Sequence, residues 1–198
     1  MKIMKIFNNY KQPKYSIGAY DVAVIKTGTF FTTARLEIAQ QKDMPSSGGW
    51  SFNWKRLWEI TNFDYQSIIK ISYNNSVLGL IRYAVYVSSE GTPYSLEILQ
   101  LESAPKNLKL VAPLGKWLIW YAVETALKFC IPDEDGTLVS LDSLEDAIAY
   151  YRDIIGMEPR GCVTIAPGEE GHAFRFIEME ARSFCQRQRN IYGQPTSI

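Results

Sequence analysis

The sequence predicts one α/β domain whose mixed, mostly antiparallel and twisted sheet is flanked by helices on both faces. Three β-rich segments with short turns between them predict an antiparallel meander. A long apolar helix and a short strand follow, which predicts a parallel pair joined by a helix crossover. The 198 residues are 46% hydrophobic and 21% charged, which suits a single globular domain with a sizeable core.

The meander is predicted from segments rich in valine, isoleucine and tyrosine. They span residues 67–73, 77–87 and 94–103, and turns at 74–75 and 88–93 separate them. These residue types favour strands, and connections this short join antiparallel neighbours. We therefore expect three consecutive strands side by side.

The crossover follows Pro105. Residues 114–130 are apolar on most sides through Val123, which predicts a helix buried against the sheet. A turn at 132–136 ends this helix, and 137–141 reads as a short strand. Because a helix joins it to the third meander strand, we expect these two strands to run parallel.

A second helix is predicted over 143–155. Ser143 and Asp146 have the spacing of a capping box, and Gly156 is typical of a residue that ends a helix. Strands at 161–165 and 172–179 follow. For the tail after them we expect either a helix or a frayed end. The apolar residues at helical spacing are Leu144, Ala147, Ile148, Tyr151 and Ile155.

The first part of the chain is the least regular. We expect a strand at 20–25, a short helix at 33–41 and an aromatic helix at 50–60. We divide the chain into an N-terminal extension packed on the domain (1–49), the domain (50–180) and a C-terminal tail (181–198). The aromatic helix carries one stripe of rings, which we expect to pack into the core or a subunit interface rather than to line a substrate cleft. The stripe consists of Trp50, Trp54 and Trp58.

Charge and composition exclude several classes of function. The chain has 21 lysines and arginines and 21 aspartates and glutamates, so it lacks the overall excess of positive charge that binding to nucleic acid usually requires. A local basic run is formed by Arg182, Arg187 and Arg189. No apolar stretch is long enough to span a bilayer, and the N-terminus lacks the apolar region of a signal peptide. We therefore expect a cytoplasmic protein that binds neither membranes nor nucleic acid.

Cysteine and histidine are scarce. The chain has three cysteines, Cys130, Cys162 and Cys185, without paired spacing, and His172 is its one histidine. This predicts neither a disulfide framework nor a metal site. Nucleophilic chemistry of the Ser-His or Cys-His type would need His172 as the base, and we expect it to be a structural residue instead.

The order of elements and two motifs resemble the GNAT superfamily of acyl-CoA-dependent N-acyltransferases. Residues 101–105, Leu-Glu-Ser-Ala-Pro, resemble the family's L-x-V-x-P strand end. The resemblance implies that this strand parts from its parallel neighbour at a bulge, and that the main chain of Leu101, Glu102 and Ser103 binds the pantetheine arm and the thioester oxygen. A fixed N–H aimed at a developing oxyanion lowers the barrier to acyl transfer.

The second motif contains a candidate general acid. Tyr151-Arg152-Asp153-Ile154-Ile155-Gly156 resembles the family's Tyr helix, with one more residue between tyrosine and glycine than the family has. The resemblance implies that Tyr151 protonates the departing thiolate, with Tyr150 as the alternative. A packed core aromatic is the competing interpretation of Tyr151.

The pyrophosphate loop departs from the family pattern R/Q-x-x-G-x-G/A, because only Gly115 matches it. The resemblance implies that Gly115, Lys116 and Trp117 at the start of the long helix meet the phosphates, with charge from Lys109 and Lys116. For the base, strand alternation predicts that Glu97 and Glu102 lie on opposite faces, and we choose Glu102 over Glu97. A solvated rim carboxylate is the competing interpretation.

Two functions follow. The first is transfer of an acyl group, most simply acetyl, from acetyl-CoA or another acyl-CoA to an amine of a small molecule or peptide, with no metal. The alternative is a non-catalytic GNAT-fold module that binds a partner. The degenerate loop and the tryptophan stripe favour this alternative. A homodimer is left open.

Overall fold

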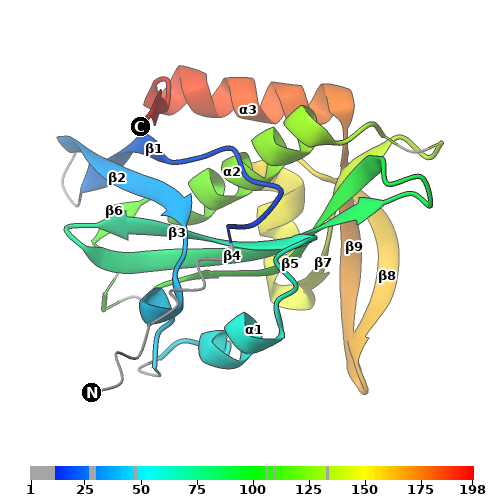
Figure 1. Ribbon diagram of the computed structural model, residues 1–198, viewed down its shortest axis with the longest axis horizontal. Coiled ribbons are helices and arrows are strands. Elements are labelled where there is room, and N and C mark those ends of the chain that lie inside the picture. The colour runs from blue at the N-terminus through cyan, green and yellow to red at the C-terminus, as the bar shows by residue number, and fades with distance from the viewer. Residues whose placement is uncertain (1–11, 27–29, 47–48, 106, 109, 133) are drawn as a thin grey trace, which may run out of the picture.

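The computed structural model describes residues 12–26, 30–46, 49–105, 107–108, 110–132 and 134–198 (Figure 1). Ten strands form one sheet in the order β10-β1-β2-β3-β4-β5-β7-β9-β8, and β6 pairs with one end of β1. The strands are β1 (Tyr20–Lys26), β2 (Phe30–Ile38), β3 (Gln66–Tyr73), β4 (Ser76–Val87), β5 (Pro93–Ser103), β6 (Val111–Ala112), β7 (Thr137–Leu144), β8 (Glu158–Ala166), β9 (Glu169–Ile177) and β10 (Thr196–Ser197).

Helices cover both faces of the sheet, as predicted. In Figure 1, α2 and α3 lie on one side of β3 and β4, and α1 lies on the other. The helices are α1 (Trp54–Ile60), α2 (Leu114–Phe129) and α3 (Glu178–Tyr192), with short turns η1 (Gln41–Asp43) and η2 (Glu145–Ala147) and the π-helical η3 (Tyr150–Ile155). Among the described residues, no helix has the length and hydrophobicity needed to cross a membrane.

The meander, the crossover and the final hairpin are confirmed. β3, β4 and β5 pair antiparallel in sequence, and β5 and β7 are parallel, joined through α2. β8 and β9 form the antiparallel hairpin that follows. The tail folds as α3, and its last residues return to the sheet, where Thr196 pairs with Asp21 of β1.

The helix expected at 33–41 is wrong, because these residues form most of β2. Ala34 and Leu36 are buried while Thr33 and Arg35 are exposed, so the apolar residues alternate with period two. β2 pairs along its length with β1 and, at its end, with β3. The extension thus contributes strands to the same sheet as the domain.

The helix expected from Ser143 is also wrong at its start. Ser143 lies in β7, where its hydroxyl donates to the carbonyl of Leu144 at 2.8 Å instead of capping a helix. Helical structure begins only at Glu145 and ends as predicted at Gly156, whose φ of 83° is left-handed. Glycine adopts this conformation without steric cost, which explains the stop.

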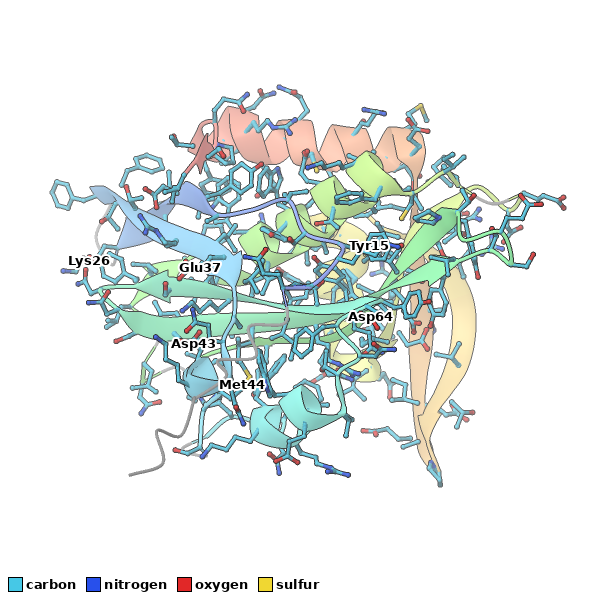
Figure 2. All side chains as sticks on the ribbon, in the orientation of Figure 1. Tyr15, Lys26, Glu37, Asp43, Met44 and Asp64 are labelled. Carbon is cyan, nitrogen blue, oxygen red and sulfur yellow. The ribbon has the colours of Figure 1, made fainter. Side chains whose placement is uncertain are left out.

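The sheet separates two hydrophobic cores. The larger core lies under α2 and α3, and Gly79 of β4 lets α2 approach, because a Cβ there would lie 2.9 Å from Leu118. The smaller core lies under α1 and contains Trp54, Leu80 and Met44, and Figure 2 shows Met44 between α1 and the sheet. At its edge Lys70 bonds Asp43 at 2.9 Å and Glu37 at 3.2 Å, which ties η1 and β2 to β3.

The tryptophan stripe belongs to the core, as favoured from the sequence. Helix α1 begins at Trp54 and not at residue 50, because the Asn53 side chain accepts from the Arg56 amide at 3.1 Å and caps the helix there. Trp54 is fully buried, and Trp50 and Trp58 pack against the same core while half-buried. The stripe therefore leaves little surface for a partner.

Candidate active site

The candidate site lies where β5 leaves its parallel neighbour. The two strands pair only at Leu96, Glu97 and Ile98, opposite Val139, Ser140 and Leu141. Beyond this point β5 continues to Ser103 beside β4, and β7 continues to Leu144 beside β9. The C-terminal half of β5 is therefore paired on one side only.

A β-bulge marks the point of separation. Arg82 of β4 pairs with Gln100 and Tyr83 with Ile98, so Leu99 is an extra residue on β5. A bulge of this kind bends its strand and increases the local twist. It accounts for the divergence of β5 from β7 directly after Ile98.

Main-chain amides face into the opening. The amide of Ala104 donates to the carbonyl of Leu78 at 2.8 Å. Because hydrogen bonding alternates along an antiparallel ladder, Glu102 then bonds to β4, and the N–H groups of Leu101 and Ser103 point away from it. In the described part of the sheet β7 pairs with neither residue, so both amides remain available to a ligand.

The start of α2 lies beside a tyrosine hydroxyl. Pro113 precedes the helix and Val111 and Ala112 pair with β1, so a short strand leads into the helix where the family pattern has a glycine loop. Gly115 is close to Tyr150, since an added Cβ would lie 3.0 Å from its hydroxyl oxygen. Lys116 is half-buried in the first turn, and Lys109 lies outside the described residues.

Trp117 lies in the first turn of α2, and its side chain points into the protein. It is fully buried, and its indole N–H donates to the carbonyl of Ala23 in β1 at 2.8 Å. Its ring packs against Trp120 and Tyr192. The residue fastens α2 to β1 and to α3, because helix periodicity turns it toward them.

The two candidate tyrosines point to different neighbours. Their rings meet edge to face at 5.3 Å, with Tyr150 toward Gly115 and Tyr151 toward Phe174 of β9 at 5.8 Å. Burial raises the pKa of Tyr151 to about 12, and burial with the neighbouring tyrosines raises the pKa of Tyr150 further. Both phenols therefore stay protonated at neutral pH, as a general acid requires.

Glu102, chosen from the sequence as the base, serves as an acceptor for the segment before α1. Its carboxylate accepts from the amides of Ser51 and Phe52 and from the indole N–H of Trp54 at 2.8 Å. A carboxylate that accepts three hydrogen bonds is held in place, and its acceptor positions are already occupied. Its surroundings indicate a structural role.

Glu97 lies on the same face of the sheet as Glu102, so the expectation of opposite faces is wrong. Simple alternation fails because the bulge at Leu99 adds one residue between them. The carboxylate of Glu97 accepts a hydrogen bond from the hydroxyl of Tyr86. This bond, together with burial, raises the pKa of Tyr86 to about 12.

Sequence reasoning missed two residues of β4: Tyr86, which bonds Glu97, and Arg82, which lies on the same face of the strand. Arg82 is buried and bonds three neutral oxygens, those of Thr61 at 3.0 Å, Gln100 at 2.9 Å and Gln66 at 2.7 Å. One signal was visible, because Arg82 is the only charged residue in the apolar strand β4. Within the described residues, no cluster of three or more potential ligands could hold a metal ion.

Neither a protein-family model nor a curated protein matches the chain, but solved structures do. A probable GNAT-family acetyltransferase of Chromobacterium violaceum is 13% identical with a TM-score of 0.50, over 81% of this chain and 97% of that one. RimJ of Mycobacterium smegmatis, solved with CoA-disulfide, is 9% identical with a TM-score of 0.56, over 94% and 100%.

A third similar structure is the aminoglycoside acetyltransferase AAC(6')-Ib, solved with coenzyme A and kanamycin. It is 15% identical with a TM-score of 0.53, over 76% of this chain and 98% of that one. Identities this low show a shared fold and no more. Together with the order of the strands, they show that the chain has the GNAT fold, in a divergent form.

Proposed function

We propose that the chain is an acyl-CoA-dependent N-acyltransferase that transfers an acetyl group to an amine of a small molecule or peptide. One observation carries the proposal: β5 separates from β7 after Ile98 and leaves the amides of Leu101 and Ser103 directed into the opening. Unpaired N–H groups inside a sheet are rare unless something binds them. A pantetheine amide and a thioester oxygen would satisfy them.

In the reaction, the amine nitrogen attacks the carbonyl carbon of the thioester. The carbonyl oxygen becomes an oxyanion, which accepts a hydrogen bond from the Ser103 amide. The tetrahedral intermediate then collapses, the carbon–sulfur bond breaks and the amide product forms. Because the amide is fixed by the β4 ladder, it needs no reorganisation as the charge develops.

The departing thiolate takes a proton from a tyrosine, and we assign this role to Tyr150. Its hydroxyl lies against Gly115 at the start of α2, the helix that follows β5. Tyr151 instead packs on Phe174, on the side of β9. A phenol held protonated by burial can donate once the sulfur leaves.

Glu97 is the better candidate to accept the proton that the amine loses. It is one of the three β5 residues that pair with β7 before the opening, and among the described residues its carboxylate bonds one donor, Tyr86. Glu102 is already bound to three donors. The proton passes from the ammonium group to Glu97 directly or through water.

The residues present fit the two ends of an acyl-CoA unequally. The amides of Leu101 and Ser103 suit the pantetheine arm. At the start of α2, Pro113 has no N–H and Gly115 is the one glycine, so the phosphates would rely on the amides of Gly115 and Lys116 and on the Lys116 charge. We expect a weaker grip on the pyrophosphate than on the pantetheine.

Thermal unfolding with and without ligand tests this proposal. Acetyl-CoA at millimolar concentration should raise the melting temperature, because a ligand that binds only the native state stabilises it. A panel of primary amines and peptides, followed by release of free CoA thiol, then tests turnover. No shift with acetyl-CoA and no thiol release would sink the proposal.

The second candidate is a non-catalytic module on the same fold. One observation favours it: the segment before α2 is a strand paired with β1 and lacks the glycines that admit a pyrophosphate. The tryptophan stripe no longer supports it, because Trp54 is buried. Stabilisation by acetyl-CoA without turnover of any amine would favour a binding module.

A further inference from the structure

The three cysteines differ sharply in their surroundings. Cys185 is buried in α3 and Cys130 is half-buried at the end of α2. Burial raises the pKa of both thiols, that of Cys130 to about 11. Cys162 on β8 is exposed. Because the thiolate is the nucleophile, the two buried thiols are held in their unreactive form and Cys162 is free to react.

Cys162 faces the one histidine of the chain. The two residues lie directly opposite in the β8–β9 ladder, and the Sγ of Cys162 is 3.7 Å from the Nε2 of His172. Cross-strand neighbours on one face of a sheet are close enough for side-chain contact. The one histidine of the chain is therefore paired with the exposed thiol.

The ladder fixes the position of His172 on both sides. His172 pairs with Ser143 of β7 as well as with Cys162 of β8. The preceding Gly171 lets β9 lie close to β7, because a Cβ there would lie 2.3 Å from the carbonyl oxygen of Ser143. The imidazole is thus carried by an inner strand and not by a loop.

The buried ring nitrogen indicates which tautomer is present. The Nδ1 of His172 is buried and has no hydrogen-bond partner among the described residues. A neutral imidazole carries one N–H, and a buried donor without an acceptor is costly. The proton is therefore better placed on Nε2, from which it points to the sulfur of Cys162.

We propose that Cys162 and His172 form a reactive thiol site that undergoes exchange with small disulfides. The thiol proton passes to solvent, and the Nε2–H of His172 donates to the thiolate. The sulfur attacks one sulfur of the disulfide and forms a mixed disulfide. The original sulfur–sulfur bond breaks and its second sulfur leaves as a thiolate, so Cys162 is oxidised as that sulfur is reduced.

The site shares no residue with the opening between β5 and β7, so its test does not depend on acyltransfer. The folded chain is treated with a nitrobenzoate disulfide, the released thiolate is followed by absorbance, and the modified cysteine is found by peptide mass. We expect one fast thiol, mapped to Cys162. Oxidised glutathione should modify the same residue reversibly.

Variants then isolate the role of the histidine. His172→Phe removes the N–H and should slow the reaction about threefold, because the attacking sulfur loses its hydrogen-bond donor. His172→Gln retains an N–H and should restore most of the rate. Cys130→Ser and Cys185→Ser should leave the fast thiol unchanged.

Two outcomes would overturn the proposal. One is a fast thiol at Cys130 or Cys185, and the other is an unchanged rate in His172→Phe. If that variant unfolds, Cys185 becomes reactive and reports it. In that case the reaction rate of Cys162 is compared between the folded wild-type chain and a free peptide of residues 158–166. Cys162 must react faster in the folded chain, and an equal rate overturns the proposal.

Discussion

The two halves of β5 belong to one strand but differ in their neighbours. Leu96–Ile98 are paired on both sides, with β4 and with β7, whereas residues 100–103 are paired with β4 alone. The first half therefore completes the sheet, and the second presents free amides. A single extra residue, Leu99, separates the two environments, which shows how one strand can serve both the fold and a binding site.

The two glutamates of β5 lie one in each half, and the number of hydrogen bonds to their side chains does not follow the strand pairing. Glu97 lies in the doubly paired half, yet its carboxylate meets one donor among the described residues. Glu102 lies in the open half, yet its carboxylate holds the segment that leads into α1. The unpaired main-chain amides therefore lie in one half of the strand, and the glutamate with fewer hydrogen bonds lies in the other.

The largest effect should come from removing an amide in the open half. Ser103→Pro deletes an N–H that faces away from β4, so the ladder is kept while the oxyanion donor is lost. Turnover should fall about 100- to 1,000-fold. Ser103→Ala keeps the N–H and should retain most of the turnover. Equal rates for the two variants in an acetyl-CoA assay would remove this amide from the mechanism.

Next is the pair of tyrosines. Tyr150→Phe should lower turnover by about 100-fold, because the leaving thiolate loses its proton donor. Tyr151→Phe should have a small effect on turnover, since its ring packs on Phe174. The measurement is kcat at saturating acetyl-CoA. A larger loss in Tyr151→Phe would reverse the assignment.

The glutamates give a smaller effect on turnover. Glu97→Gln should lower turnover about tenfold, less than a fully enclosed general base would, because water can carry the proton in its place. The loss should shrink as the assay pH rises and more of the amine is already neutral. A turnover equal to wild type at neutral pH would show that Glu97 is not the base.

The smallest effect on chemistry is expected from Glu102→Gln, which should leave turnover near wild type. The amide side chain can accept fewer of the bonds from Ser51, Phe52 and Trp54, so the free energy of unfolding should drop by about 1–3 kcal/mol. Denaturant unfolding measures this change. A stable but inactive variant would restore Glu102 as the base.

The central part of the fold could be predicted from the sequence because each element there has one clear period. β3, β4 and β5 are rich in β-branched residues, and α2 is apolar around most of its surface. The alternation of Ala34, Leu36 and Ile38 in β2 was also present in the sequence, but short segments of this kind are ambiguous between strand and helix. The Ser143–Asp146 spacing misled because the pairing of β7 with β9 outweighed a local cap.

The candidate site was less predictable because it depends on register. The strand end at Leu101–Ser103 was found from its motif. The bulge at Leu99 was not, because it appears only when β5 is aligned with β4. It changes which side of the sheet Glu97 faces, and with it the choice of base. The packing of the Trp117 side chain likewise depends on the positions of β1 and α3, which no local pattern supplies.

The inserted residue Leu99 also determines which face of the sheet each earlier side chain of β5 points to. Shortening the chain by this one residue would turn the strand over upstream, so that Glu97 would face the core beneath α2 and Ile98 would face solvent. Such a deletion should prevent folding, whereas replacing Leu99 by another residue should not. The length of this strand is therefore fixed more strictly than its composition.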